Sequence, residues 1–188
     1  MSNNQTEIEK KFLIKKEFTP SVDFHTIYQA YFLDENKENK RIRLVPEEKK
    51  AILCFKKDIG QVNGFIERIE IENEIPYEDG LIKLIKAPKF IVKKRYLIPF
   101  DGRVIELDIF QNLNFSLTMA EIEIKKEDIN DVIKYPSWFD KDVSLLKKYR
   151  NVNLIKFTEN YDFHLKSLLN DQVLKKEVLM LKNPKLKK

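Results

Sequence analysis

The sequence predicts an α+β protein built on an eight-stranded antiparallel β-barrel, with helices packed outside it and further helices at its C-terminal end. Three observations support this fold class. Residues 5–126 alternate between apolar and polar side chains with a period of two, which is typical of β-strands. Short connections join the alternating segments, and these favour antiparallel neighbours. After residue 126 the pattern changes to helical spacing.

Eight segments rich in branched and aromatic residues are the predicted strands. They are residues 6–14, 25–33, 40–46, 50–57, 65–73, 91–99, 103–111 and 118–125. The clearest hairpin is FDGR at 100–103, where an Asp-Gly pair separates two strand-like segments. Strands joined in this way are expected to close into a barrel whose interior holds side chains or one small ligand.

Four segments have the spacing of helices. Residues 77–87 form a short helix that ends before Pro88, and residues 126–135 form another that PSWF interrupts. A third helix is expected within 142–151 and a long one over 153–182, where apolar residues form a stripe. We therefore divide the chain into a barrel domain, 1–155, and a helical extension with a basic tail, 156–188.

The composition points to a cytoplasmic protein with an anionic partner. The 188 residues are 43% hydrophobic and 35% charged, with a net charge of +5, which favours phosphates, nucleic acid or acidic lipid. Cys54 is the single cysteine, so no internal disulfide can form. No apolar segment approaches the roughly 18 residues of a membrane span, and the N-terminus lacks the apolar core of a signal peptide.

Several kinds of site are excluded. With only four glycines, the chain has neither a Walker A motif nor a GxGxxG loop. The chain has two isolated histidines, His25 and His164, and one cysteine, Cys54, which are too few ligands for a structural zinc site. We interpret these three residues and Trp138 as structural. Any phosphate must therefore be bound by Lys and Arg side chains.

Charged residues recur two apart in most of the predicted strands, so each pair lies on one face. Carboxylates are paired in the first, fifth, seventh and eighth strands, and cations lie in the third, fourth and sixth. The opposite faces are apolar. A sheet with one face in solvent also produces this pattern, so two arrangements remain open. Amphipathic helices need an apolar surface, and the signs are sorted by strand; both observations favour charges inside the barrel.

The chain resembles the triphosphate tunnel metalloenzymes, also called the CYTH superfamily. The resemblance rests on the N-terminal ExExK motif, Glu7 to Lys11, and on seven later segments in the same order. These are RIRL at 41–44, ILCFK at 52–56, RIEIE at 68–72, KKRY at 93–96, IELDIF at 105–110, AEIEI at 120–124 and DVSLLKKYRN at 142–151. It covers residues 5–155 and is strongest with small bacterial inorganic triphosphatases.

The resemblance implies an eight-stranded tunnel that holds a triphosphate and a divalent metal, Mg²⁺ or Mn²⁺. It implies that phosphate oxygens are bound by Lys11, Arg41, Arg43, Lys56, Arg95 and Lys147. The metal site would be formed by Glu7, Glu9, Glu121 and Glu123, and the acidic wall would be completed by Glu70, Glu72, Glu106 and Asp108. Lys10 lies on the outward face with Ile8 and is expected to take no part.

Lys93 and Tyr31 are the candidate catalytic residues. QAYFL at 29–33 resembles the segment that supplies a tyrosine near the attacking water, and Lys93 would be the base if its pKa is low enough. Lys93 as another phosphate-binding cation and Tyr31 as an ordinary barrel aromatic remain alternatives.

The predicted function is metal-dependent hydrolysis of a triphosphate, with inorganic tripolyphosphate as the first substrate. Alternatives within the superfamily are thiamine triphosphatase, nucleotide or RNA 5′-triphosphatase and class IV adenylate cyclase. A further alternative is a binder of polyphosphate or nucleic acid without catalysis, which the basic tail could support. A homodimer is left open.

Overall fold

The computed structural model describes residues 3–33 and 39–169 of the chain. Its nine strands are β1 (Asn3–Ile14), β2 (Phe24–Leu33), β3 (Asn39–Val45), β4 (Lys50–Val62), β5 (Phe65–Ile75), β6 (Ile91–Phe100), β7 (Arg103–Phe110), β8 (Thr118–Ile124) and β9 (Phe139–Asp142). The α-helices of the described residues are α1 (Tyr77–Lys86), α2 (Asn151–Leu154) and α3 (Tyr161–Leu168). Short 3₁₀ turns are η1 (Pro46–Glu48), η2 (Lys126–Asp128), η3 (Lys147–Tyr149) and η4 (Ile155–Phe157).

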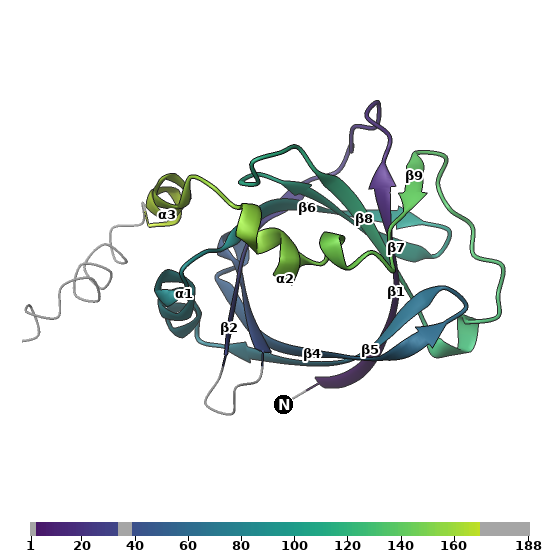
Figure 1. The fold of residues 1–188 in the computed structure, drawn as a ribbon, viewed down its shortest axis with the longest axis horizontal. Coiled ribbons are helices and arrows are strands. Elements are labelled where there is room, and N and C mark those ends of the chain that lie inside the picture. The colour runs from purple at the N-terminus through teal and green to yellow at the C-terminus, as the bar shows by residue number, and fades with distance from the viewer. Residues whose placement is uncertain (1–2, 34–38, 170–188) are drawn as a thin grey trace, which may run out of the picture.

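Eight of these strands close into an antiparallel barrel (Figure 1). Their order is β5-β4-β3-β2-β6-β7-β8-β1, and β1 pairs again with β5 to complete the ring. Strand β1 achieves this because Glu7 lies opposite Arg68 on β5, whereas Lys11 lies opposite Glu121 on β8. The predicted eight-stranded barrel is therefore confirmed. Strand β9, which pairs with the end of β1, was not predicted.

The hydrophobic core lies on the outside of the barrel, between the strands and the segments that cover them. On β1, Ile8 and Phe12 belong to two such apolar clusters, while Glu7, Glu9 and Lys11 occupy the other face. Helices α1 and α3 lie side by side on one flank of the barrel (Figure 1) and pack into the largest cluster. Because apolar side chains occupy the outer face, the charged face of each strand points inward.

Helix α1 lies very close to the barrel wall. It has acidic residues in its first turn and Lys83 and Lys86 in its last, which match the helix dipole. At Gly80 a Cβ atom would lie 2.4 Å from the Cβ of Ala51 and 2.8 Å from Cδ2 of Leu44. Only a residue without a side chain permits this approach.

The predicted helix over 126–135 is wrong. Only η2 forms there, and the chain then follows an irregular path to β9. Ile129 and Ile133 pack against the outer clusters of the barrel, and the Asn63 side chain donates a hydrogen bond of 2.9 Å to the Ile129 carbonyl. These contacts with the barrel replace the helix that the local spacing favours.

The other C-terminal helices are shorter than predicted. Within 142–151 the chain first completes β9, and only η3 and the first residue of α2 are helical. The helix predicted over 153–182 is interrupted because Thr158 forms a β-bridge with Leu113, and Asn160 then has a positive φ of 54°. Helix α3 begins after this break. The remainder of that predicted helix and the basic tail lie at 170–188, outside the described residues.

None of the helices in the described ranges has both the length and the apolar content required to cross a membrane.

Candidate active site

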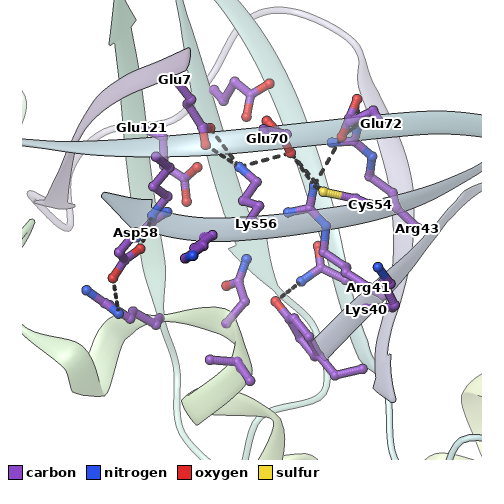
Figure 2. Close-up of a pocket in the computed structure, with 18 of the residues that line it drawn as sticks. Glu7, Lys40, Arg41, Arg43, Cys54, Lys56, Asp58, Glu70, Glu72 and Glu121 are labelled. Atoms are coloured by element: carbon purple, nitrogen blue, oxygen red, sulfur yellow. Dashed lines mark hydrogen bonds and ion pairs between the residues drawn. The ribbon is translucent and has the colours of Figure 1, made fainter. Parts of the chain in front are cut away.

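The inward faces of the strands surround a cavity of about 580 Å³. Figure 2 shows side chains from opposite walls pointing into it, with Lys56 between Glu7 and Glu70. Arg150, Asn151 and Val152, around the start of α2, contribute to the lining. The other residues that line the cavity are Glu7, Lys11, Gln29, Tyr31, Lys40, Arg41, Arg43, Cys54, Lys56, Lys57, Asp58, Arg68, Glu70, Glu72, Arg95, Glu106, Glu121 and Glu123.

Glu7, Glu9 and Glu123 form an acidic cluster on one side of the cavity. One carboxylate oxygen from each lies within 4.8 Å of the others. The register brings them together, because Glu9 on β1 lies opposite Glu123 on β8 and Glu7 is two residues away on the same face. Partial desolvation by the surrounding side chains and the neighbouring Glu7 raise the pKa of Glu123 to about 8, although the residue is exposed. The pKa of Glu9 is also raised, by burial and by Glu121 and Glu7. The carboxylates of the cluster therefore repel one another, although Lys56 contacts Glu7 and Arg68 and Lys11 contact Glu9.

The residues of this cluster fit a divalent cation such as Mg²⁺ or Mn²⁺. Oxygen ligands from carboxylates are the ones these ions prefer. The Glu9 side chain is completely buried, yet its Oε2 atom has no hydrogen-bond partner among the described residues. A cation between the three carboxylates would satisfy that atom and offset the like charges that raise the pKa of Glu123.

A second region of the cavity holds carboxylates that are neutralised by cations. Asp108 is fully buried and accepts hydrogen bonds from Lys93 and from Arg95, whose Nε lies 2.7 Å from Oδ1. Lys11 binds Glu121 and also lies 3.1 Å from Oε1 of Glu9. Burial acts to raise the pKa of Glu121, but Lys11, Arg95 and Lys93 hold it well below its usual range. This region, Lys11, Lys93, Arg95, Asp108 and Glu121, is called the paired cluster below.

A third group joins β3, β4 and β5. Nη2 of Arg41 lies 2.9 Å from Glu70 and 3.1 Å from Glu72, and Arg43 binds Glu72 at 2.9 Å. Cys54, which we interpreted as purely structural, lies inside this group and donates to Glu70 at 3.0 Å. Burial raises the pKa of its thiol to about 12, so it stays protonated. The two guanidinium groups thus lie side by side on β3, each paired with a carboxylate of β5.

Lys93 and Tyr31 do not form a pair in this structure. Lys93 lies opposite Ile27 on β2, four residues before Tyr31, and it binds Asp108. The Tyr31 hydroxyl lines the cavity and accepts a hydrogen bond of 2.7 Å from Gln29. Burial and Arg95 lower the pKa of Lys93 to about 8, although Asp108 acts against this.

The predicted site residues fall into three sets. Twelve line the cavity: Glu7, Lys11, Tyr31, Arg41, Arg43, Lys56, Glu70, Glu72, Arg95, Glu106, Glu121 and Glu123. Glu9, Lys93 and Asp108 lie behind these residues, buried and bonded to them. Lys147 is exposed on η3 and does not line the cavity, whereas Arg150 does.

Sequence reasoning missed Cys54, Asp58 and Arg150. Cys54 and Asp58 lie two residues on either side of Lys56, so the alternation that placed Lys56 inside also places them there. The predicted strand ended at residue 57, whereas β4 continues to Val62. Arg150 follows η3, and no periodicity in the sequence separates it from Lys147 and Lys148.

Comparisons with known proteins identify relatives of this chain in sequence and in fold. No established protein-family profile matches the chain. The inorganic triphosphatase of Acetivibrio thermocellus is 33% identical over 153 residues, which span 80% of this chain and 93% of that protein. The inorganic triphosphatase of Nitrosomonas europaea is 26% identical over 149 residues, 78% of this chain and 94% of that protein.

Among solved structures, the crystal structure of the hypothetical protein NE1496 has the same fold. It superposes with a TM-score of 0.52 at 24% sequence identity, over 81% of this chain and 99% of that one. The likeness in sequence extends across nearly the whole length of the two curated relatives, and the barrel and its charged interior are as the resemblance predicted. The chain therefore belongs to the inorganic triphosphatases, a family with the triphosphate tunnel fold.

Proposed function

We propose that this protein hydrolyses inorganic tripolyphosphate inside the barrel, with Mg²⁺ or Mn²⁺ as cofactor. The observation that carries the proposal is the composition of the cavity wall. Nearly all of its side chains are charged or polar, and a cluster of three carboxylates lies beside a wall of Lys and Arg. Both curated relatives are named inorganic triphosphatases, and the family suggests dependence on a metal.

The cations of the wall are proposed to bind the phosphate oxygens. Arg41 and Arg43 offer planar guanidinium groups suited to two oxygens at once, and Lys11, Lys56 and Arg95 offer compact or bidentate positive charge. Each of these cations is now paired with a carboxylate, as in the contact of 2.6 Å between Lys56 and Glu7. These ion pairs keep the cations neutralised when the cavity is empty. An entering triphosphate would replace the carboxylates as the partner of the cations.

The metal is proposed to lie between Glu7, Glu9 and Glu123, where it would offset charge on the phosphate being transferred. The four carboxylates proposed for the acidic wall each contact a cation, and so does Glu121, which we first expected to be a metal ligand. They therefore orient Lys and Arg side chains toward the substrate. These carboxylates are Glu70, Glu72, Glu106, Asp108 and Glu121.

Phosphoryl transfer requires mainly positioning and charge stabilisation from the protein. The proposed base is Lys93, whose pKa of about 8 leaves a fraction of it neutral at neutral pH. Its amine is buried and binds Asp108, so it must release that carboxylate to reach a water in the cavity. Tyr31 is held by Gln29 on β2, the strand next to β6, and is proposed to orient the substrate or the attacking water. Arg150 takes the place first given to Lys147 as the cation contributed by the C-terminal segment.

The direct test is phosphate release from tripolyphosphate, ATP, GTP and thiamine triphosphate, each with Mg²⁺, Mn²⁺ or Ca²⁺. We expect the highest kcat/KM for tripolyphosphate, because the wall offers no apolar pocket for a base. Formation of cyclic AMP from ATP would identify a cyclase instead. No phosphate release from any substrate with any of these metals would refute the proposal.

A further inference from the structure

A chain of alternating charges connects the C-terminal segment to the acidic cluster. Arg150 precedes α2, which lies across one end of the barrel (Figure 1). Its Nη1 lies 2.6 Å from Oδ2 of Asp58, and Oδ1 of Asp58 accepts a hydrogen bond of 2.8 Å from Nε of Arg68. Arg68 in turn binds Oε1 of Glu9 at 2.5 Å. Each oxygen of Asp58 therefore binds a different arginine.

The position of Asp58 depends on the geometry of β4. Asp58 lies opposite Arg68 on β5, and the register between the two strands shifts between Asp58 and Gly60. The residue inserted at this bulge, Ile59, is exposed. A bulge changes the direction of a strand locally and often directs a side chain toward a site. Here Asp58 points into the cavity, as Figure 2 shows, and its carboxylate lies between the barrel wall and the C-terminal segment.

Glu9 is held by two cations, and both contact the same carboxylate oxygen. These cations are Arg68 and Lys11, and the oxygen is Oε1. Its Oε2 has no partner among the described residues and stays available for a cation. The orientation of Oε2 therefore depends on the guanidinium of Arg68, which is nine-tenths buried and fixed on its far side by Asp58.

We propose that Asp58 and Arg150 are positioning residues that couple the seating of the C-terminal segment to the metal affinity of the acidic cluster. The inference rests on the proposed function, because it takes Glu7, Glu9 and Glu123 as metal ligands. Loss of Arg150 would leave Asp58 held by Arg68 alone, so Arg68 would position Glu9 less firmly, and Lys11 would be the remaining fixed cation beside Glu9. Outer partners of metal ligands commonly change metal affinity in this way.

Arg150→Gln is the decisive variant, because two explanations predict opposite results. If Arg150 acted only through electrostatic repulsion of a bound cation, removing its positive charge would strengthen the binding of that cation to the acidic cluster. If Arg150 acts by positioning, the same change weakens it. Asp58→Asn is expected to weaken binding on either explanation, so it supports the mechanism but does not by itself separate the two.

The experiment measures Mn²⁺ binding to the metal-free, full-length protein by titration calorimetry and by the electron paramagnetic resonance signal of free Mn²⁺. No substrate is present, so a contact between Arg150 and phosphate cannot contribute. We expect the Kd for Mn²⁺ to rise about three- to tenfold in Arg150→Gln and in Asp58→Asn. Residues that hydrogen-bond to metal ligands typically change metal affinity by about 10- to 100-fold, so this effect lies at or below the lower end of that range. The double variant should be no weaker than the worse single variant.

Lys148→Gln is the matched control, because it removes an exposed cation two residues from Arg150 without a contact to Asp58. Its Kd should stay within about twofold of the wild-type value. Thermal unfolding of each variant checks that it is folded. An unchanged or lower Kd in Arg150→Gln would overturn the coupling while leaving the proposed function intact. A wild-type protein that binds no Mn²⁺ would overturn the proposed metal site and this inference with it.

Discussion

Glu121 and Glu123 are two residues apart on β8 and face the same cavity, yet their surroundings differ in kind. Glu121 belongs to the paired cluster, where Lys11, Arg95 and Lys93 keep it ionised. Glu123 belongs to the acidic cluster, where partial desolvation and Glu7 raise its pKa to about 8. The comparison shows how one barrel separates two tasks. In the paired cluster Lys11 contacts Glu121, and Lys93 and Arg95 contact Asp108. In the acidic cluster Glu7 and Glu9 contact cations, but the Oε2 atom of Glu9 has no partner among the described residues and Glu123 lies beside Glu7. This difference is the reason for the metal position that we propose.

The largest effect is expected in the paired cluster. Asp108→Asn would leave Lys93 and Arg95 buried without their shared carboxylate. Breaking one side of a buried ion pair costs about 3–5 kcal/mol, so the free energy of unfolding in urea should fall by roughly that amount. Asp140→Asn, on exposed β9, is the control and should change it by less than about 0.5 kcal/mol. A loss at Asp108 no greater than at Asp140 would contradict the role assigned to the paired cluster.

The next largest effect is expected in the acidic cluster, and on activity. Glu7→Gln removes one proposed ligand and should lower metal-dependent hydrolysis of tripolyphosphate by about 100-fold or more. The protein should remain folded, because Lys56 loses Glu7 but keeps its contact of 3.2 Å with Glu70, and the substitution relieves repulsion with Glu123. Glu67→Gln provides a control at an adjacent position, since Glu67 lies opposite Ile8 on the outward face of β5. Equal activity in the two variants would show that the acidic cluster is not the metal site.

A smaller effect concerns pH. The folded protein raises the pKa of Glu123 from the ordinary value of 4.5 to about 8, so between these pH values it holds a proton that the unfolded chain has lost. Its contribution to stability is therefore complete below about pH 4.5 and is lost as the pH rises through 8. Without metal, the unfolding free energy of the wild type should fall more steeply from pH 5 to 8 than that of Glu123→Gln.

Urea titrations at several pH values measure this slope. Glu127→Gln, at an exposed position on η2, should retain the wild-type slope. Mn²⁺ should remove the difference between the wild type and Glu123→Gln if the metal displaces the proton of Glu123. Equal slopes for the wild type and Glu123→Gln would mean that the carboxylates of the acidic cluster do not interact as described.

The smallest effect is expected at Lys10. Its Nζ lies outside the barrel, 4.8 Å from the centre of the Phe65 ring and 3.6 Å from Asp142. Lys10→Gln should reduce stability by about 0.5–1 kcal/mol and change kcat/KM by less than about twofold. Lys11→Gln, one residue further, removes the partner of Glu9 and Glu121 and should reduce kcat/KM far more. Similar kinetic losses in both variants would contradict the inward and outward faces of β1.

The period of two in the sequence predicted the eight strands and which charges share a face, and the amphipathic helices and the sorting of charges by strand then favoured the interior for that face. The period could not predict which carboxylate meets which cation, because that depends on register. Glu9 faces Glu123 across β1 and β8, while Lys11 faces Glu121, and a shift by two residues could place Glu9 opposite Glu121 and Lys11 opposite Met119 instead. Register is decided by contacts between distant strands, which a single sequence does not display.

The C-terminal third was predicted less well, because its local pattern competes with contacts to the barrel. Ile129 and Ile133 have helical spacing but pack separately onto outer clusters. Thr158 lies within an apolar stripe but forms a bridge with Leu113. In each case contacts with the outer surface of the barrel determine the path of the chain. The same dependence explains why the contribution of Arg150 to the cavity was missed.

The absence of a side chain at Gly80 has a consequence on the opposite side of the wall. The barrel is a single layer of backbone, so a residue that contacts α1 is the direct neighbour of one that faces the phosphate-binding space. Leu44, which approaches Gly80, follows Arg43 in the sequence, and Ala51 lies opposite Leu44 on β4. A methyl group added at Gly80 would press on this pair from outside and displace the adjoining guanidinium inside. We therefore expect the position of α1 outside the wall to limit the width of the cavity inside it, although no residue of α1 lines that cavity.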